Sequence, residues 1–99
     1  MDERNELILL YDYYKDLLSD PQRRYFEDYY FNNLSLGEIS ETINISRNAV
    51  HKQLKSACKK LYFYEENLHM IKLNNELNDL LNSIDDEKIK ERLTKIIES

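Results

Sequence analysis

Two serines, Ser35 and Ser46, each begin a phrase that is typical of the start of a helix. Glu38 follows Ser35 in the spacing of a capping box, in which each side chain accepts a hydrogen bond from a backbone N–H group of the first turn. Ser46 precedes a second helical pattern as its cap. Asn44 lies between the two, where a tight turn needs a left-handed residue, and Asn tolerates that conformation best after Gly. Residues 35–60 are therefore predicted to form a helix-turn-helix.

The apolar residues of this segment have the spacing that such a motif needs. Leu36, Ile39 and Ile43 share one face of the first helix, and Val50 and Leu54 share one face of the second. We expect these five side chains, together with Ile45, to be buried between the helices. Small residues, Ser40 and Ala49, would allow close approach of the two helices.

The rest of the chain also has helical periodicity. It contains one Gly and one Pro in 99 residues, too few for the turns of a sheet protein. Apolar residues spaced three and four apart predict a helix over about residues 3–18, and Ser19 with Gln22 forms a second capping box before a helix over 21–31. Tyr11, Tyr14, Tyr25 and Tyr29 lie at core spacing, which favours packing over base stacking. The predicted fold class is all-α.

After Ser46 no helix breaker occurs before Asn82-Ser83. The apolar positions repeat every 3.5 residues, and the repeat is rotated around the axis near residue 71, so two alternatives stay open: one long helix that changes its packing partner, or a bend in the chain. Ser83–Asp86 then caps a final helix. We expect residues 1–66 to form the helix-turn-helix domain, and residues 67–99 to continue from it as a dimerisation arm with no core of its own. The expected dimer contacts are Leu73, Leu77, Leu80, Leu81, Leu93 and Ile96.

The charge distribution singles out the second helix of the motif. No acidic residue occurs between Glu41 and Glu65, a stretch that holds five basic residues, whereas the rest of the chain carries −10 because the total is −5. Arg, Asn and His side chains can address base edges, and Lys suits phosphates. The predicted nucleic-acid contacts are Arg47, Asn48, His51, Lys52, Lys55 and Lys59. Five basic residues allow a salt slope of at most about −4.5, so one copy would bind weakly and a homodimer would double the contacts.

Other functions find no support in the sequence. His51 and His69 have no Cys or carboxylate at ligand spacing, and Cys58 is a lone small residue on a helix, so neither a metal site nor a disulfide is expected. No Gly-rich phosphate loop, nucleophile–base pair or paired carboxylates occur, so we expect neither an enzyme nor a cofactor. The acidic first residues do not resemble a signal peptide, and no apolar run is long enough to span a membrane. A cytoplasmic protein is expected.

Three blocks, Leu18–Tyr25, Leu34–Glu41 and Ile45–Val50, resemble region 4 of bacterial sigma factors. With the Tyr-rich Leu10–Tyr14 and with Glu65–His69, the chain is more similar to the YlxM-like family of small bacterial helix-turn-helix proteins, over about residues 7–72. The resemblance implies a sigma-region-4-like fold and a regulatory role connected with the signal recognition particle. It departs at Asn44, where sigma-type motifs usually have Gly.

Two functions are left open by these observations. The first is a DNA-binding regulator that uses the basic helix. The second is an adaptor that docks on a protein or RNA component of the targeting machinery and does not bind DNA, which the negative total charge and the surplus of C-terminal apolar residues favour.

Overall fold

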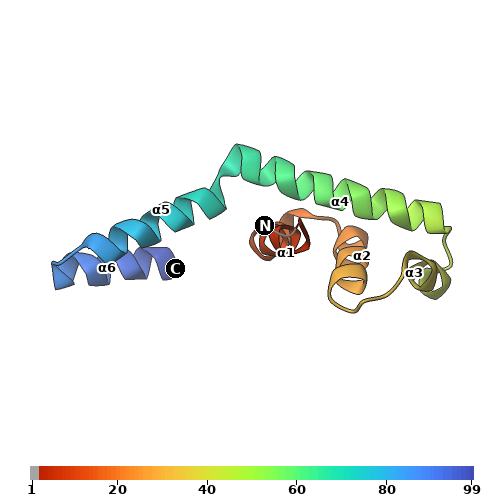
Figure 1. Ribbon diagram of the computed structural model, residues 1–99, viewed down its shortest axis with the longest axis horizontal. Coiled ribbons are helices and arrows are strands. Elements are labelled where there is room, and N and C mark those ends of the chain that lie inside the picture. Colours follow the sequence, from red (N-terminus) through yellow and green to blue (C-terminus); the bar gives the residue numbers. More distant parts are fainter. Residues whose placement is uncertain (1–2) are drawn as a thin grey trace. The chain divides into compact units, whose positions relative to one another are not determined.

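The computed structural model describes residues 3–99, which form α-helices, one 3₁₀ helix and their connections (Figure 1). The chain divides into two compact units, with the boundary between Asn67 and Leu68. In chain order the elements are α1 (Glu3–Tyr14), η1 (Lys15–Leu17), α2 (Asp20–Tyr30), α3 (Leu36–Ile43), α4 (Arg47–Leu68), α5 (Met70–Ser83) and α6 (Glu87–Glu98). The predicted all-α class is confirmed.

An aromatic cluster forms the centre of the first unit. Phe26 of α2 has no exposed surface. Its ring stacks on Tyr11 of α1 with centroids 4.3 Å apart and makes a tilted contact with Tyr30 at 4.5 Å. Burial, followed by the hydrogen bond and the charge of Glu27, raises the pKa of Tyr11 to about 12. Tyr14 is buried as expected, but Tyr29 keeps 37% of its surface exposed, because its side of α2 is not covered. The bulky core position of this helix is Phe26.

The first helix is shorter than the sequence predicts. Its α-helical part ends at Tyr14, and residues 15–17 form the tighter turn η1 instead of continuing to residue 18. Ser19 then caps α2 in the predicted capping box, accepting from the backbone N–H of Gln22. The early end of α1 lets Leu18 take an extended conformation and enter the core with 6% exposure.

Helix α4 extends along α1, α2 and α3 in Figure 1 and supplies the long wall of the first unit. Its buried residues, Val50, Leu54, Ala57 and Leu61, follow a four-three-four spacing, which places them on one side of the helix. The helix ends at Leu68, and His69 adopts a left-handed conformation with φ 56° before α5 begins. The sequence left open either one long helix after Ser46 or a bend in the chain near residue 71. The interruption at His69 excludes the single long helix.

The second unit is a pair of packed helices, α5 and α6. Asp86 caps α6 by accepting hydrogen bonds from the backbone N–H groups of Lys88 and Ile89. No residue of either helix is fully buried. Half-buried positions recur at the same i, i+3, i+4, i+7 spacing on both, and they mark the sides that meet: 74, 77, 78 and 81 on α5, and 90, 93, 94 and 97 on α6.

Candidate nucleic-acid interface

The predicted turn between α3 and α4 is present, and backbone and side-chain hydrogen bonds hold it. Asn44 ends α3 in the left-handed conformation with φ 54°, and the backbone N–H groups of Asn44 and Ile45 both donate to the carbonyl of Ser40. Ser46 caps α4, since its side chain accepts from the backbone N–H of Ala49 at 3.1 Å. These contacts give partners to backbone groups that have none where one helix ends and the next begins. They therefore fix the backbone conformation of the turn between α3 and α4.

The start of α3 is held by the second capping box. Ser35 accepts from the backbone N–H of Glu38, and its own N–H donates to the Glu38 carboxylate at 3.0 Å. These bonds keep the pKa of the Glu38 carboxyl below its usual value. Ser35 thus begins α3 as the sequence predicts.

The inner side of the motif is closed by two residues without exposed surface, Ile39 of α3 and Val50 of α4. Leu54 is buried beside them, whereas Leu36 and Ile43 are half-buried. Ile45 does not fit the expectation, because it lies in the turn and keeps 36% of its surface exposed. The apolar core of the motif is therefore formed by side chains of α3 and α4, and not by the side chain of the turn residue Ile45.

The opposite side of α4 carries a row that we call the Lys stripe: Asn48, Lys52, Lys55 and Lys59. All four residues are exposed. Each lies two positions before a residue of the buried row of α4, so the two rows have the same spacing. Two residues correspond to about 200° around an α-helix, so the row as a whole faces away from the core, and of its members Lys55 also lines a hollow with Leu54 and Cys58. The acid-free first turn of α4 lies at one end of the stripe, and Phe63, with 59% exposure, lies beyond the other.

The remaining two predicted contacts, Arg47 and His51, are also exposed but belong to a neighbouring row. Each lies one position before a member of the Lys stripe, which is about 100° around the helix. All six predicted residues thus lie on the N-terminal part of α4 and are exposed. They occupy two neighbouring sides of the helix rather than one. The Lys stripe is the part that faces solvent squarely.

Gln22 is a positioning residue that sequence reasoning did not identify beyond its role in a cap. Only 4% of its surface is exposed. Its Nε2 donates to Gln53 Oε1 and Ser56 Oγ, both at 3.4 Å, while its Oε1 accepts from Lys60 Nζ at 3.3 Å. The amide therefore ties the start of α2 to the middle of α4, and Lys60 is used in this contact rather than in the Lys stripe. A polar residue at the third position of a capping box was the only sequence signal.

The predicted dimer residues separate into two groups. Leu77, Leu81 and Leu93 are half-buried on the sides where α5 and α6 meet. Leu73, Leu80 and Ile96 keep 47%, 52% and 66% of their surfaces exposed. Ile89, which the sequence prediction omitted, is 54% exposed and belongs with this second group.

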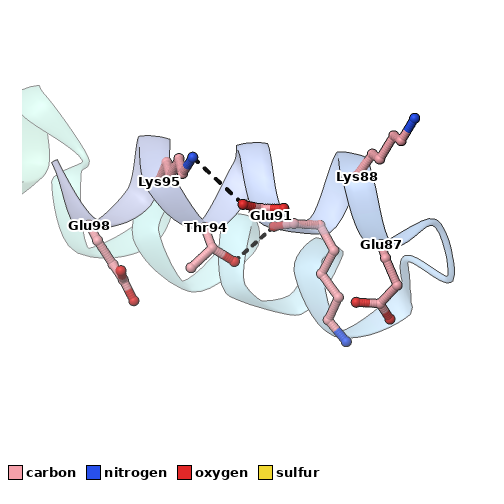
Figure 2. Close-up of a pocket in the computed structure, with 7 residues that line it drawn as sticks. Glu87, Lys88, Glu91, Thr94, Lys95 and Glu98 are labelled. Atoms are coloured by element: carbon pink, nitrogen blue, oxygen red, sulfur yellow. Dashed lines mark hydrogen bonds and ion pairs between the residues drawn. The ribbon is translucent and has the colours of Figure 1, made fainter.

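A hollow of 590 Å³ in the second unit is lined by residues of α6 alone, most of them charged. Figure 2 shows Lys95 directed toward Glu91. The N–O separation of this ion pair is 3.6 Å, and Thr94 Oγ1 donates to the Lys90 carbonyl. Both members of the ion pair are more than two-thirds exposed. Such a pair stabilises the helix only slightly, and we regard this surface as a solvated helix face.

Residues 3–99 contain neither a metal-binding cluster nor a membrane-spanning helix. No group of three or more His, Cys, Asp or Glu side chains is arranged to hold a metal ion. No helix in this range combines the length and the apolar character needed to cross a membrane.

The fold and the exposed basic helix define the class: this is an all-α protein built on a helix-turn-helix. The chain belongs to the UPF0122 family, described as "Putative helix-turn-helix protein, YlxM / p13 like", which matches residues 1–99. A UPF0122 protein of Thermoanaerobacter sp. strain X514 is 46% identical over 99 aligned residues, covering 93% of this chain and 85% of the relative. A UPF0122 protein of Fusobacterium nucleatum is 36% identical and covers 100% and 96%. One of Mycoplasma capricolum is 39% identical and covers 88% and 77%. The family resemblance seen in the sequence is confirmed.

Proposed function

We propose that this protein is a DNA-binding regulator that contacts the duplex through α4. The observation that carries the proposal is the Lys stripe, which faces solvent, contains three positive charges and has no acidic neighbour between residues 42 and 64. In a helix-turn-helix the second helix enters the major groove with its N-terminal turn leading. Arg47 and Asn48 would then address base edges, and Lys52, Lys55 and Lys59 would contact phosphates along the groove.

The decisive experiment compares salt dependence on a random duplex. In the variant Lys52→Gln/Lys55→Gln/Lys59→Gln, loss of three phosphate contacts should reduce the magnitude of the slope of log K against log salt by about 2.7. The side chains are exposed, so the fold should be preserved, which circular dichroism checks. Fluorescence anisotropy at several salt concentrations measures the slope.

The matched control is Lys88→Gln/Arg92→Gln/Lys95→Gln, which removes the same charge from exposed positions of α6. It should change the slope by much less, since these residues lie on the charged face of another helix. Equal effects of the two triple variants would show that only net charge matters, and failure of the wild type to bind even at low salt would remove the proposal.

The second part of the proposal is a homodimer formed through the second unit. Leu73 and Leu80 each lie one position before a residue of the α5 side that meets α6, and Ile89 and Ile96 stand in the same relation on α6. Because the two helices of a hairpin run in opposite directions, equal rotations in each helix's own frame point to the same side of the pair. The four exposed side chains therefore lie on the same side of the α5–α6 pair and form one apolar face. In a dimer, the α5–α6 pair of a second copy would cover this face, which gives a four-helix arrangement.

The alternative function is an adaptor that docks on the protein or RNA of the signal recognition particle. It is favoured by an open groove of 440 Å³ beside α1, where exposed Leu9 and Phe31 are flanked by Asp12 and Glu27. Lys15 also lines the groove, so its rim carries two carboxylates and one ammonium around the apolar side chains. A basic amphipathic segment of a protein partner would pair with the two carboxylates. Pull-down with the particle's protein and RNA separately tests this function, and failure with both would remove it.

A further inference from the structure

A second cavity of the first unit shares a residue with the Lys stripe. Its volume is 260 Å³, and it is lined by residues from α1, α2, α3 and α4. Leu7, Leu36 and Leu54 provide apolar walls, of which Leu7 and Leu54 belong to the buried core. Lys55 lines the same cavity. One cation of the predicted nucleic-acid surface thus also borders a solvent-open hollow with leucine side chains in its wall.

The size and lining of the cavity set the kind of molecule that would fit. An apolar cavity of about 150 Å³ can hold benzene, so this one has room for a single ring with a short polar arm. Small-molecule sites are typically apolar with a few converging polar groups. Here α4 contributes His51 and Lys55, whereas the one carboxylate in the lining, Glu3, comes from α1.

The inner polar groups are uncharged and already hydrogen-bonded. Tyr30 Oη and Cys58 Sγ lie 3.8 Å apart in contact with each other, and burial raises the pKa of both groups. A phenol and a thiol in their neutral forms accept an aromatic ring beside them more readily than ions would. The charge that selects a ligand is therefore the ammonium of Lys55.

We propose that this cavity binds a small aromatic carboxylate, and that its binding opposes the binding of nucleic acid. The ring would lie against Leu7, Leu36 and Leu54, and the carboxylate would pair with Lys55. A Lys55 side chain held by the ligand no longer neutralises a phosphate. By linkage, nucleic acid must weaken ligand binding by the same factor. The regulatory half of this proposal rests on the proposed DNA-binding function, whereas the site itself does not.

The site is tested with phenylacetate as the probe, in two-dimensional amide NMR titrations of the full chain. We expect saturable shifts confined to amides around Leu7, Leu36, Leu54 and Cys58. The uncharged phenylacetamide and the cationic phenethylamine should bind at least about fivefold more weakly, the scale of one partly exposed ion pair. The absence of saturable shifts, or tighter binding of phenethylamine through Glu3, would overturn the proposal.

Two exposed lysines of α4 provide matched variants. Lys55→Gln should weaken phenylacetate about fivefold, whereas Lys52→Gln, which removes the same charge one turn away outside the cavity, should leave it unchanged. Equal weakening by both would mean attraction by general charge only and would exclude the site. Cys58→Met, which fills part of the cavity, should reduce binding without altering charge.

Competition with a fluorescent duplex tests the regulatory half. Saturating phenylacetate should lower duplex affinity of the wild type and reduce its salt slope by about one, while the Lys55→Gln variant should not respond. Ligand binding with an unchanged duplex affinity would overturn the coupling. If no duplex binds at all, the DNA-binding function and the coupling both fail, and the confined NMR shifts still decide whether the cavity is a ligand site.

Discussion

At the scale of single residues, Gln22 links two parts of the first unit that are distant in sequence. The same side chain closes the capping box of α2 and reaches Gln53, Ser56 and Lys60 of α4. A buried amide is tolerated only when its donors and acceptor are satisfied, and here all of them have partners. The position of α4 relative to α2 therefore depends on a polar contact as well as on apolar packing.

We expect Gln22→Leu to lower the free energy of unfolding by about 2 kcal/mol, because it removes a cap contact and leaves the groups on α4 without their partner. Urea denaturation followed by circular dichroism measures the change. Gln53→Ala, at an exposed position of the same network, should cost about 0.5 kcal/mol. A Gln22→Leu variant as stable as the wild type would show that the hydrogen bonds of Gln22 do not contribute to the free energy of unfolding.

At the scale of elements, the helix-turn-helix depends on the backbone conformation of Asn44. Left-handed geometry is costly for most L-residues, and Asn reduces the cost because its short polar side chain is compatible with it. The chain uses the same device at Asn33 and at His69, where φ is 56° in both. Asn44 and His69 lie at the ends of α3 and α4, and Asn33 lies in the connection between α2 and α3. In this chain with one Gly, other residues therefore take the positive φ that glycine usually provides.

Substitution of Asn44 should separate this conformational effect from side-chain contacts. Asn44→Gly is expected to keep the stability of the wild type within about 0.5 kcal/mol, whereas Asn44→Val should lose about 1–2 kcal/mol, since a β-branched residue resists positive φ. Thermal and urea unfolding provide the measurement. Asn75→Val, on the exposed side of α5, controls for the loss of an Asn and should have a smaller effect. Equal losses at both positions would contradict the role assigned to the turn.

At the scale of the whole molecule, the acidic balance and the apolar surface of the second unit bear on the same question. A monomer presents one Lys stripe in a chain with a net charge of −5, so electrostatic attraction to a polyanion is weak. Two copies would double the phosphate contacts and hence the salt slope. The proposed regulator thus requires the second unit to bring two copies of the first together.

We expect the wild type to have twice the chain mass of 12.0 kDa by light scattering, and Leu73→Asp/Leu80→Asp to have the mass of one chain. The two leucines are about half exposed, so the hairpin itself should remain folded. Asn75→Asp/Asn82→Asp adds the same two charges to exposed positions of α5 and should stay dimeric. Unchanged mass in the leucine variant, or a monomeric wild type, would refute dimerisation through this face.

Features that arise from contacts between residues close in sequence could be predicted, whereas features set by distant helices could not. The capping boxes at Ser19 and Ser35, the Ser46 cap and the left-handed Asn44 were all predictable, because each is a contact between residues a few positions apart. The Lys stripe was also predictable in large part, since helix periodicity places its members on one side. The end of α1 at Tyr14 and the exposure of Ile45 were not, because they depend on what the neighbouring helices cover.

By itself the sequence determined the all-α class, the two helices of the motif and the acid-free row on α4, because local hydrogen bonds and the 3.6-residue period govern all three. The tertiary structure decided which long-range partners each side chain received. It assigned Lys60 to Gln22, interrupted the long helix at His69 and placed Lys55 on both the Lys stripe and the cavity. Those outcomes follow from packing between segments far apart in the chain, which no local pattern encodes.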